Sequence, residues 1–494
     1  MDFAPSLIHE SEVPLYRQLY QQFAEKIRSQ ELPRGERLPA TRELAGLLGL
    51  NRTTVSAAYE MLEAEGLISG QVGRGSFVTG HAAAAAGVDW NSLLERSEMP
   101  AAGRAGGAPP GPGGEVVNFV MSRPSHALFP LDEFRASCEA VLARQDLASI
   151  LQLGSPAGFE PLRRYLMEEA RRQHVAGPGD DLIVTNGCQQ ALDLIGRVML
   201  RPGDTVAVED PVYPGLKNLL AGIGAQLVGI PVGADGIDIA QLERVLEREQ
   251  PRFLVVTSNF QNPTGATLPL AARRQLLEAA RAARVPVVEN DAYGELRYEG
   301  EPLPAIKQLD EHGGTVLLRS FSKVSFPGLR VGWVVGPKHL IDRLRQAKEA
   351  ADLHTDQLSQ AVLLEFAESG RLEAHRARVL QAGAERLAAT LDACRWYLPA
   401  NARWTRPQGG MNVWVRLPEP LDAGELLPRA QKEGVAYLPG RYFAVSRLEP
   451  GALRLSFAGP TPDQIRSGLA ILGRIVAGEM ESVSGSFEPA SAMV

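Results

Sequence analysis

Apolar residues recur at every fourth position near the start of the chain, at Leu15, Leu19, Phe23 and Ile27. This spacing predicts an amphipathic helix, which Pro14 would open. Two further helical stretches, TRELAGLL and RTTVSAAYEMLEAEG, stand on either side of the short turn GLN. A helix, a short glycine-containing turn and a second helix form a helix-turn-helix arrangement. The segment LISGQVGRGSFV that follows predicts a two-stranded ribbon with glycines at its tip.

From about residue 116 the pattern changes, because strand-like apolar runs alternate with helical runs rich in Ala, Leu and Arg. The run DLIVTNG precedes QQALDLIGRVML and DTVAVEDP, and the alternation continues through FLVVTSN, VPVVEND, TVLLRSFS and VGWVVG. Strands that alternate with helices predict an α/β fold with a mostly parallel sheet covered on both faces. In such sheets the working site lies at the carboxyl ends of the strands.

Composition separates these two patterned regions. Residues 81–115 include HAAAAAG and AAGRAGGAPPGPGG, which carry few large apolar side chains and cannot build a core. We therefore expect an N-terminal helical module over residues 1–80, a flexible linker over 81–115 and a large module over 116–479. The Ser/Gly-rich end of the chain, residues 480–494, is expected to be a disordered tail.

The bulk numbers narrow the class of protein. The chain has 494 residues, a formal net charge of −7 and 45% hydrophobic residues, so any nucleic-acid surface must be local. Three widely spaced cysteines, Cys138, Cys188 and Cys394, favour reduced thiols over a disulfide framework or a zinc site, and we expect no bound metal. The N-terminus shows no signal-peptide pattern, and no apolar run is long enough to span a bilayer. We therefore expect a cytoplasmic protein.

The second helix of the predicted helix-turn-helix starts with short hydrogen-bonding side chains and an arginine, which reach phosphates and base edges in a major groove. The candidate DNA-binding residues are Arg42, Arg52, Thr53, Thr54, Ser56, Gly73 and Arg74. Residues 1–80 hold eight Arg/Lys against ten Asp/Glu, but Glu60, Glu63 and Glu65 lie at the far end of this helix. Local placement decides binding, because only phosphates within reach are contacted. On pattern alone, a generic three-helix bundle with solvated arginines is the alternative.

One of the seven lysines in the chain, Lys323, follows the strand-like run TVLLRSFS and precedes VSFPGLRVGW. It is therefore expected at the carboxyl end of a strand. A partly desolvated amine at such a place can form a Schiff base with an aldehyde cofactor. Ser320, Ser322 and Arg330 add two hydroxyls and a guanidinium suited to a phosphate. A solvated surface lysine is the alternative.

Other polar residues stand at the ends of other predicted strands. Gly187, Cys188 and Gln189 open a helix whose free N–H groups favour an anion. The remaining candidates for a cofactor cradle are Tyr213, Asn262, Asn290, Asp291 and Tyr293. Taken singly each is weak, and only their order and spacing together point to one site.

Two resemblances join these motifs. The segment LPATRELAGLLGLNRTTVSAAYEMLEAEGLI, followed by GRGSFV, resembles the GntR-type winged helix, which implies DNA binding. The polar motifs between residues 116 and 475 resemble, in order and spacing, the fold type I (class I/II) aminotransferases, which use pyridoxal phosphate. Both in one chain resemble the MocR/GabR subfamily of GntR regulators. In that subfamily an aminotransferase-like domain senses an amino compound or the cofactor itself.

The aminotransferase resemblance implies roles for the matching residues. Lys323 would be the Schiff-base lysine, and Asn262 and Tyr293 would hydrogen-bond the phenolic oxygen of the cofactor ring. Arg454, in LRLSFAG, matches the arginine that pairs with a substrate carboxylate, and a solvated strand-end arginine is its alternative. The residues that would hold the phosphate are Ser320, Ser322, Arg330 and residues 187–189. Fold type I sites form at a dimer interface, so a homodimer that reads two DNA half-sites is implied.

Two positions depart from the enzyme pattern. Asn290 occupies the place of the aspartate that keeps the pyridine nitrogen protonated in aminotransferases, and an amide cannot stabilise that charge as a carboxylate does. The adjacent Asp291 would substitute only if the strand end shifted, because strand alternation points it to the opposite face. Leu153 stands where many dimeric members have a tyrosine that reaches the partner's phosphate. We therefore expect the domain to bind pyridoxal phosphate and to transaminate poorly.

The sequence thus predicts a transcription factor that binds operator DNA and senses pyridoxal phosphate or an amine effector. An active aminotransferase for 2-aminoadipate-like or aromatic amino acids is the main alternative. Lys323 and Arg454 support it, whereas Asn290 and the well-formed reading helix oppose it. A third possibility is a DNA-binding protein whose large domain serves only for dimerisation. The effector, the operator, the target genes and the sign of regulation stay open.

Overall fold

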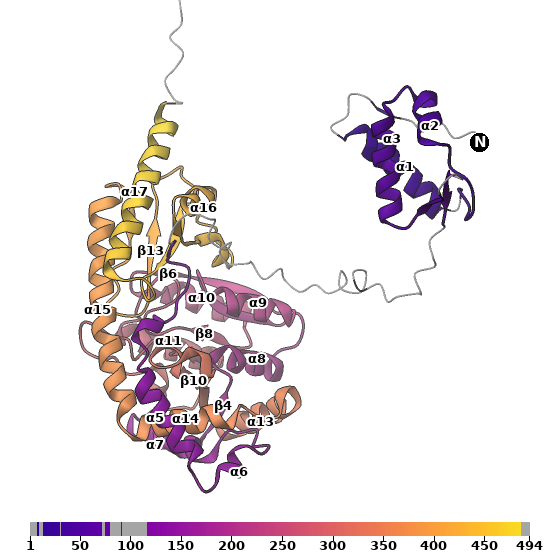
Figure 1. The fold of residues 1–494 in the computed structure, drawn as a ribbon. Helices are drawn as coiled ribbons and strands as arrows, with labels where there is room; N and C mark the ends of the chain where they lie inside the picture. The colour runs from indigo at the N-terminus through magenta and orange to yellow at the C-terminus, as the bar shows by residue number, and fades with distance from the viewer. Residues whose placement is uncertain are drawn as a thin grey trace, which may run out of the picture. The chain divides into compact units, whose positions relative to one another are not determined.

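The computed structural model describes residues 7–8, 13–29, 31–71, 75–79, 90 and 116–485. Contacts between Cα atoms divide the chain into two compact units, Met1–Glu98 and Met99–Val494 (Figure 1). The boundary between the units falls within the predicted linker, which lies outside the described residues except for residue 90.

The N-terminal unit contains the three helices that the apolar pattern predicts. Its elements are α1 (Leu15–Arg28), α2 (Thr41–Leu48), α3 (Arg52–Ala64), β1 (Ile68–Gln71) and β2 (Gly75–Val78). Leu19 and Phe23 of α1 share one core with Val55 and Leu62 of α3. The spacing of four residues that suggested α1 therefore marks its buried face.

Local sequence specifies the turn between α2 and α3. Gly49 ends α2 in the left-handed conformation, with φ of 66°, which favours a residue without a Cβ. Two residues later the Asn51 side chain caps α3 by accepting a hydrogen bond from the Thr53 N–H at 3.1 Å. The helix predicted to begin near residue 51 thus begins at Arg52.

The ribbon after α3 is attached to the helices by polar contacts. β1 and β2 are antiparallel and pair Ile68 with Val78. The Gly70 N–H in β1 donates to Glu63 Oε1 of α3 at 2.9 Å. One of the acids at the far end of α3 is therefore used to position the ribbon. The predicted ribbon is present, and its tip, residues 72–74, lies outside the described residues.

The large unit is built on an eight-stranded sheet in the order β4-β11-β10-β9-β8-β5-β6-β7. The strands are β4 (Asp180–Thr185), β5 (Thr205–Asp210), β6 (Gln226–Gly233), β7 (Gly236–Ile237), β8 (Leu254–Val256), β9 (Val287–Asn290), β10 (Thr315–Ser320) and β11 (Gly332–Pro337). Neighbouring strands run parallel except at β11 and at the short β6–β7 hairpin. This confirms the predicted α/β class with a mostly parallel sheet.

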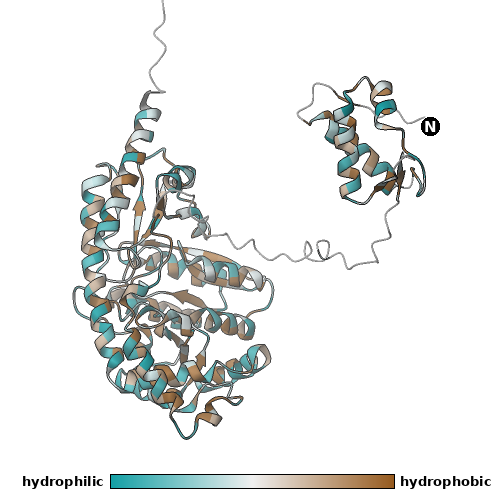
Figure 2. Cartoon of the chain, viewed as in Figure 1, coloured by the Kyte–Doolittle hydropathy of each residue, from teal (hydrophilic) through white to brown (hydrophobic). Residues whose placement is uncertain are grey.

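Helices cover both faces of this sheet. They are α5 (Leu131–Leu142), α6 (Leu147–Ile150), α7 (Glu160–Arg172), α8 (Cys188–Met199), α9 (Pro214–Gly222), α10 (Ile239–Glu249), α11 (Leu270–Ala283), α12 (Ile306–Leu309), α13 (Lys338–Asp352) and α14 (Gln357–Glu368). In β4, Leu182 and Val184 share a core with α7 and α14, whereas Ile183 faces the core that contains α8 and α13. Figure 2 shows the resulting layers, with brown strands between helices that are partly teal.

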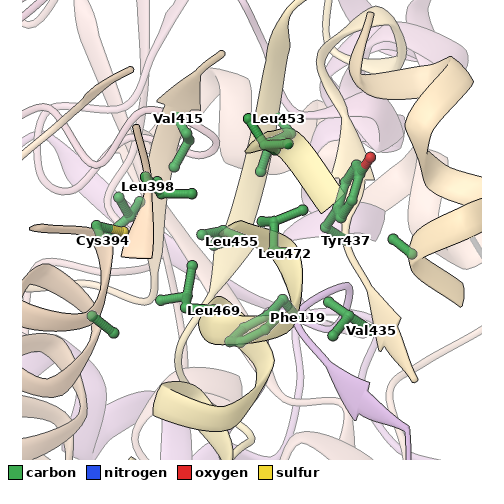
Figure 3. Packing of buried hydrophobic residues seen from close by; sticks show 14 of the residues in the cluster. Phe119, Cys394, Leu398, Val415, Val435, Tyr437, Leu453, Leu455, Leu469 and Leu472 are labelled. Atoms are coloured by element: carbon green, nitrogen blue, oxygen red, sulfur yellow. The ribbon is translucent and has the colours of Figure 1, made fainter. Parts of the chain in front are cut away.

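A smaller sheet, in the order β12-β13-β16-β15, lies in the C-terminal part of this unit, where β3 also pairs with β14. Its elements are β3 (Val117–Asn118), α15 (Arg371–Tyr397), β12 (Arg403–Trp404), β13 (Asn412–Arg416), α16 (Ala423–Lys432), β14 (Val435–Ala436), β15 (Leu438–Pro439), β16 (Ala452–Ser456) and α17 (Pro462–Gly485). Phe119, directly after β3, is buried with Tyr437, Leu455 and Leu469 (Figure 3). The start of the large unit is therefore fixed to its C-terminal part.

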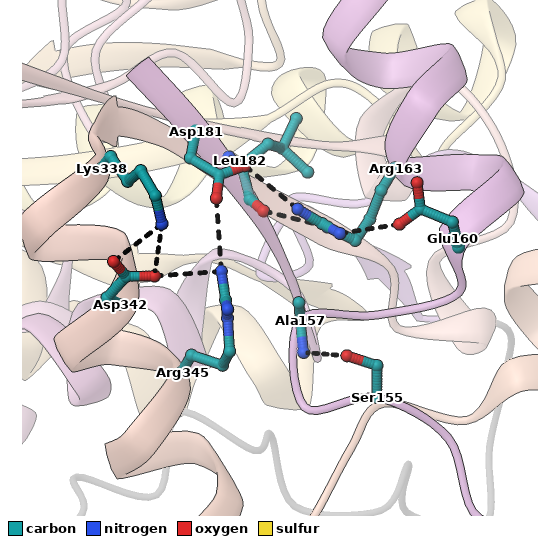
Figure 4. A network of polar contacts seen from close by, with 9 residues as sticks. All are labelled: Ser155, Ala157, Glu160, Arg163, Asp181, Leu182, Lys338, Asp342 and Arg345. Atoms are coloured by element: carbon teal, nitrogen blue, oxygen red, sulfur yellow. Dashed lines mark hydrogen bonds and ion pairs between the residues drawn. The ribbon is translucent and has the colours of Figure 1, made fainter. Parts of the chain in front are cut away.

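A network of ion pairs holds the amino end of β4 (Figure 4). Asp181 accepts from Arg163 of α7 at 3.0 Å and from Arg345 of α13 at 3.2 Å. Asp342 pairs with Arg345 at 3.2 Å and with Lys338 at 2.9 Å. The network joins α7 and α13 through Asp181 and so fixes both helices to β4.

The last helix extends beyond the predicted boundary of the large module. α17 runs to Gly485, so a disordered tail that starts at residue 480 is wrong for its first residues. Ile475 and Val476 are buried, and Met480 packs against the same core. These apolar contacts continue the helix into a stretch whose Ser/Gly composition suggested otherwise. Every helix in the described parts of the chain is too short or too polar to cross a membrane.

Candidate functional site

A cavity of about 470 Å³ lies at the carboxyl ends of the central strands of the large sheet. The predicted site residues that line it are Cys188, Gln189, Tyr213, Asn262, Asn290, Tyr293, Ser320, Ser322, Lys323, Arg330 and Arg454. Among the described residues, no Asp or Glu lines it, so Lys323, Arg330 and Arg454 set its charge. The structure therefore brings together residues that are up to 266 positions apart in the sequence, between Cys188 and Arg454.

Lys323 lies in the cavity on the short helix η2 (Phe321–Lys323), directly after β10. The Ser320 side chain caps this turn by accepting a hydrogen bond from the Ser322 N–H at 3.1 Å. Lys323 is half-buried, and its Nζ donates to the Ser122 carbonyl at 2.7 Å. The same Nζ lies 5.1 Å from the centre of the Tyr293 ring. The amine therefore faces the cavity without a carboxylate partner among the described residues.

Two hydroxyls and a guanidinium, which the sequence predicts to be a phosphate clamp, lie beside this lysine. The hydroxyl oxygens of Ser320 and Ser322 lie 2.8 Å apart, and Arg330 Nη1 is 3.5 Å from Ser322 Oγ. Arg330 Nη2 donates to the Asn186 carbonyl at 3.1 Å. Gly187 does not line the cavity, but a Cβ there would lie 2.5 Å from Arg330 Nη2, and its φ is 77°. Glycine at this position therefore lets Arg330 approach the start of α8.

Sequence reasoning missed the polar network behind this clamp. Lys348, fully buried on α13, donates to both carboxylate oxygens of Asp352 at 2.9 and 3.0 Å and to Gln190 at 2.9 Å. Asp352 also accepts from the Asn186 side chain at 2.8 Å. Burial lowers the pKa of Lys348, and the carboxylate of Asp352 opposes that shift. The spacing of four residues between Lys348 and Asp352 was the one available signal, because the other contacts are long-range.

Asn290 and Asp291 point to opposite sides of β9. Asn290 lines the cavity, and its Oδ1 is buried with no hydrogen-bond partner among the described residues. The Asp291 carboxylate lies away from the cavity, where it pairs with Arg319 at 2.9 Å and accepts from Asn259 at 2.9 Å. Asp291 as a cofactor-binding residue is therefore wrong for this structure. Strand alternation and the ion pair with Arg319 together direct it elsewhere.

Tyr293 and Asn262 meet at the wall of the cavity. Asn262 Nδ2 is 3.5 Å from the Tyr293 hydroxyl, and both side chains are buried. Burial alone raises the pKa of the Tyr293 phenol. The Lys323 ammonium, with smaller contributions from Ser122 and Arg454, outweighs it, so the pKa is lowered overall. A phenol with a lowered pKa is a strong hydrogen-bond donor toward an anionic oxygen in the cavity.

Arg454 enters the cavity from β16 and is 4% exposed. It donates to Asn262 Oδ1 at 3.1 Å and to the Val120 carbonyl, while its Nε has no partner among the described residues. Burial lowers the pKa of Arg454 to about 10, although Tyr293 and Tyr213 oppose the shift. A buried guanidinium whose hydrogen bonds go only to neutral oxygens is well suited to bind a carboxylate.

Two further positions concern the edge of the cavity. Tyr213 is the residue before α9 and is 40% exposed, so its ring is available for stacking. Leu153, in the place of the family's tyrosine, is 71% exposed. Cys188, by contrast, opens α8 in an apolar setting, and burial raises the pKa of its thiol to about 12. Cys188 therefore lines the cavity with an uncharged thiol.

The residues around the cavity fit a phosphorylated, amine-reactive ring. A primary amine, a clamp of hydroxyls with a guanidinium at a helix N-terminus, and a buried aromatic hydroxyl each face the same space. Asn290 and Ser122 also line it, and the Oδ1 of Asn290 has no partner among the described residues. Buried polar atoms in native proteins nearly always have partners, so this oxygen marks where a polar atom of a ligand belongs.

In the N-terminal unit, the candidate DNA-binding residues gather at the start of two helices. Arg42 lies in the first turn of α2, and Arg52 and Thr53 open α3; all three are exposed. Thr54 and Ser56 are half-buried on the same helix. Gly73 and Arg74, at the tip of the ribbon, lie outside the described residues.

Comparisons with known proteins cover both units. The family model "Aminotransferase class I and II" matches residues 129–472, and the model for bacterial regulatory proteins of the gntR family matches residues 15–78. Aromatic-amino-acid aminotransferase 1 of Thermococcus litoralis is 36% identical over 74% of this chain and 89% of its own length. The probable rhizopine catabolism regulatory protein MocR of Rhizobium meliloti is 30% identical over 94% of both chains.

This chain belongs to the MocR-like regulators. A MocR-like regulator joins a GntR-type helix-turn-helix unit, which binds DNA, to a class I and II aminotransferase-like domain, as the sequence motifs predicted. Kynurenine aminotransferase of Pyrococcus horikoshii, solved with PMP, superposes on the large unit with a TM-score of 0.72. It shares 35% identity over 74% of this chain and 92% of its own. Aminotransferases of this fold depend on pyridoxal phosphate, which agrees with the fit of the cavity.

Proposed function

We propose that this MocR-like regulator binds pyridoxal phosphate through Lys323 and that occupation of the cavity changes its affinity for operator DNA. The observation that carries the proposal is the cation-lined cavity in which Asn290 Oδ1 and Arg454 Nε have no partner among the described residues, in a chain that also carries a GntR-type unit. The ligand that shifts the balance is either an amine effector or the cofactor itself. A ligand shifts such a balance by binding one arrangement of the protein better than another.

The proposed roles follow the geometry. Lys323 would bind the cofactor covalently, with Asn262 and Tyr293 donating to the oxygen on its ring and Tyr213 stacking on the ring. Arg454 would hold the carboxylate of an effector. The group that would hold the phosphate comprises Gly187, Cys188, Gln189, Ser320, Ser322 and Arg330. When bound, pyridoxal phosphate supplies an electrophilic carbonyl that reacts with primary amines and a ring that withdraws electrons.

Asn290 favours sensing over turnover. Its amide would hydrogen-bond the pyridine nitrogen without a charge that keeps a proton there, and Asp291 is already paired with Arg319 at 2.9 Å. The ring would then withdraw electrons weakly, so amine exchange at Lys323 would outpace later steps. Rapid multiple turnover of an amino acid to its keto acid by the purified protein would contradict this proposal.

An active aminotransferase is the second candidate function. Lys323 and Arg454 favour it, because both residues are in place in the cavity. Its substrates would resemble those named for the relatives, such as aromatic amino acids. The two candidates differ in one measurement, which is the number of keto-acid molecules formed per protein in the presence of excess amino acid.

On the DNA side, we propose that the exposed starts of α2 and α3 contact the duplex. The contacting residues would be Arg42, Arg52, Thr53, Thr54, Ser56, Gly73 and Arg74. A homodimer through the large domain would present two such surfaces to two half-sites, with residues 81–115 as the flexible connection. We further propose that the protein acts in the cytoplasm.

Footprinting on the DNA upstream of the protein's own gene tests the proposal. The full-length protein is compared without cofactor, with pyridoxal phosphate, and with pyridoxal phosphate plus a panel of amines. We expect the protected region or the affinity to change with at least one addition. The same footprint and affinity under all three conditions would contradict ligand sensing.

A further inference from the structure

A second cavity of about 470 Å³ adjoins the first, and Met121 lines both. Three stretches of the large unit enclose the second cavity: residues 116–129, the turn at Pro327 and Gly328, and the loop that leads into α17. The family resemblance assigns no role to this space. The second cavity adjoins the one that Lys323 and Arg454 line, so an extended ligand bound in the first cavity can reach into the second.

The wall between the two cavities is the short segment Val120–Ser122. Arg454 donates to the Val120 carbonyl, and Lys323 Nζ donates to the Ser122 carbonyl at 2.7 Å. Arg123 follows directly, and its backbone nitrogen belongs to the same peptide group as the Ser122 carbonyl that Lys323 contacts. The side chain of Met121 is 40% exposed in this wall. A flexible methionine is a side chain that can shift to let a ligand pass.

Arg123 gives the second cavity a positive charge. No Asp or Glu among the described residues lines this cavity. Within residues 116–485 the Arg123 side chain has neither an ion pair nor a hydrogen bond. Most other arginines of this unit that flank a cavity are engaged; Arg330 and Arg454, for example, each donate to protein oxygens. The Arg123 side chain is exposed at this cavity, and an unpaired guanidinium attracts a carboxylate.

Part of the remaining lining suits a hydrocarbon chain. Val117, Met121 and Phe129 contribute apolar surface to the second cavity. A ligand that reaches from Arg454 past Met121 to Arg123 would therefore have an anionic group at each end and methylene groups between them. Burial of methylenes adds affinity, while the two guanidinium groups select for the two charges.

We propose that the second cavity binds the side-chain carboxylate of an effector amino acid, with Arg123 as its specificity-determining residue. The effector class is thus an α-amino acid with an anionic side chain. In this arrangement the amino group faces Lys323, the α-carboxylate pairs with Arg454 and the distal carboxylate pairs with Arg123. The inference rests on the proposed amine sensing at the first cavity and names the effector class for it.

Spectroscopic titration of the full-length, cofactor-loaded protein tests the inference. The visible absorbance of the bound cofactor is followed while L-2-aminoadipate or L-norleucine is added, since these share a six-carbon chain and differ in the distal carboxylate. L-glutamate and L-norvaline form a shorter matched pair. The titrations are repeated with Arg123→Gln, with the charge-conserving Arg123→Lys, and with Arg248→Gln as a control on exposed α10.

We expect at least one dicarboxylic amino acid to bind roughly tenfold or more tightly than its matched partner, as a charge-assisted hydrogen bond allows. Arg123→Gln should remove that preference and leave norleucine and norvaline unchanged. Arg123→Lys should keep part of it, and Arg248→Gln should keep all of it. The mass of the protein in solution should be the same in every variant.

Other results would overturn the inference in recognisable ways. Equal affinity within each pair, or an equal loss of affinity for all four amino acids in Arg123→Gln, would show that Arg123 does not recognise the distal carboxylate. A change of oligomeric state in Arg123→Gln, together with that equal loss, would make Arg123 a subunit contact instead. No spectral response to any amine would refute the proposed amine sensing itself, which the other two outcomes leave standing.

Discussion

Two buried arginines of the large unit, Arg273 and Arg454, differ in how completely their guanidinium groups are hydrogen-bonded. Arg273 of α11 is fully buried, and its guanidinium donates four hydrogen bonds of 2.6–2.8 Å, to Leu268, Pro304, Ser258 and Asn259. Arg454, at 4% exposure, leaves its Nε without a partner among the described residues. Protein oxygens therefore occupy four of the five N–H donors of Arg273, whereas Arg454 keeps its Nε available for a ligand.

Neighbouring groups repeat the difference. Behind the strands, Glu289 accepts from the N–H groups of Ile306 and Lys307, each at 2.9 Å, and Asp291 is paired with Arg319. On the cavity side, the oxygen of Asn290 has no described partner. Because unsatisfied buried polar groups cost stability, the unpartnered Asn290 Oδ1 and Arg454 Nε mark places beside the cavity where polar atoms of a ligand would fit. The comparison predicts that substitutions on the cavity side change ligand binding, whereas those on the other side change stability.

The largest expected effect is at Lys323, on the cavity side. Lys323→Ala should abolish the visible absorbance of protein incubated with pyridoxal phosphate, because no other amine among the described residues lines the cavity. The free energy of unfolding of the cofactor-free protein should change little. The exposed surface lysine variant Lys338→Ala, as a control, should retain the absorbance. A coloured Lys323→Ala protein would place the cofactor elsewhere.

The next largest effect concerns Glu209 of β5, a buried, hydrogen-bonded carboxyl group whose protonation should change with pH. Its carboxylate accepts from the Thr257 N–H at 3.2 Å, and burial raises its pKa from 4.5 to about 8. A raised folded-state pKa gives stability that is fully present below pH 4.5 and lost as pH rises through 8. Between pH 5 and 8.5, urea unfolding should therefore show a loss of about 3–5 kcal/mol from this group. Glu209→Gln should remove most of that slope, and an unchanged slope would refute the assignment.

The buried pair behind the phosphate clamp should contribute less. Lys348→Ala removes a cation that is fully buried and leaves Asp352 and Gln190 without it. We expect a loss of about 2 kcal/mol in the free energy of unfolding, since Asp352 keeps some solvent exposure. Chemical denaturation of the cofactor-free protein measures it. A loss below about 0.5 kcal/mol, the size of a surface substitution, would contradict a structural role.

The smallest expected effect is at the end of β9, where Asn290 faces the cavity and the adjacent Asp291 pairs with Arg319 on the opposite side. Asn290→Asp should raise the rate of keto-acid formation by on the order of tenfold, which corresponds to about 1.4 kcal/mol of activation free energy. Asp291→Asn should leave that rate unchanged and lower stability, because Arg319 loses its ion pair. The opposite pattern, with turnover dependent on Asp291, would show that the assignment of the two side chains is reversed.

Much of this site was predictable because each motif is local. The segment around Lys323, the turn at Asn262 and the start of α8 each carry their signal within a few residues, and strand ends bring them together. Strand alternation also indicated the direction of Asp291 correctly. The helix-turn-helix was equally local, with Gly49 and Asn51 specifying its turn.

What the sequence could not provide depends on contacts between distant segments. The pairing of Asp352 with Asn186 at 2.8 Å and of Lys323 with the Ser122 carbonyl at 2.7 Å joins residues more than 160 positions apart. No periodicity or composition reports such pairs. The end of α17 was misjudged for a related reason, since the packing of Met480 against the core outweighs its Ser/Gly-rich surroundings.

The central claim is that the cavity and the DNA-binding unit are coupled, and reciprocity gives its most direct test. The affinity of cofactor-loaded, full-length protein for an effector amine is measured by absorbance with and without saturating operator DNA. If an amine changes DNA affinity, DNA must change amine affinity by the same factor, typically about 5- to 150-fold. We predict a change within that range. The same affinities for the amine and for pyridoxal phosphate with and without operator DNA would contradict the account.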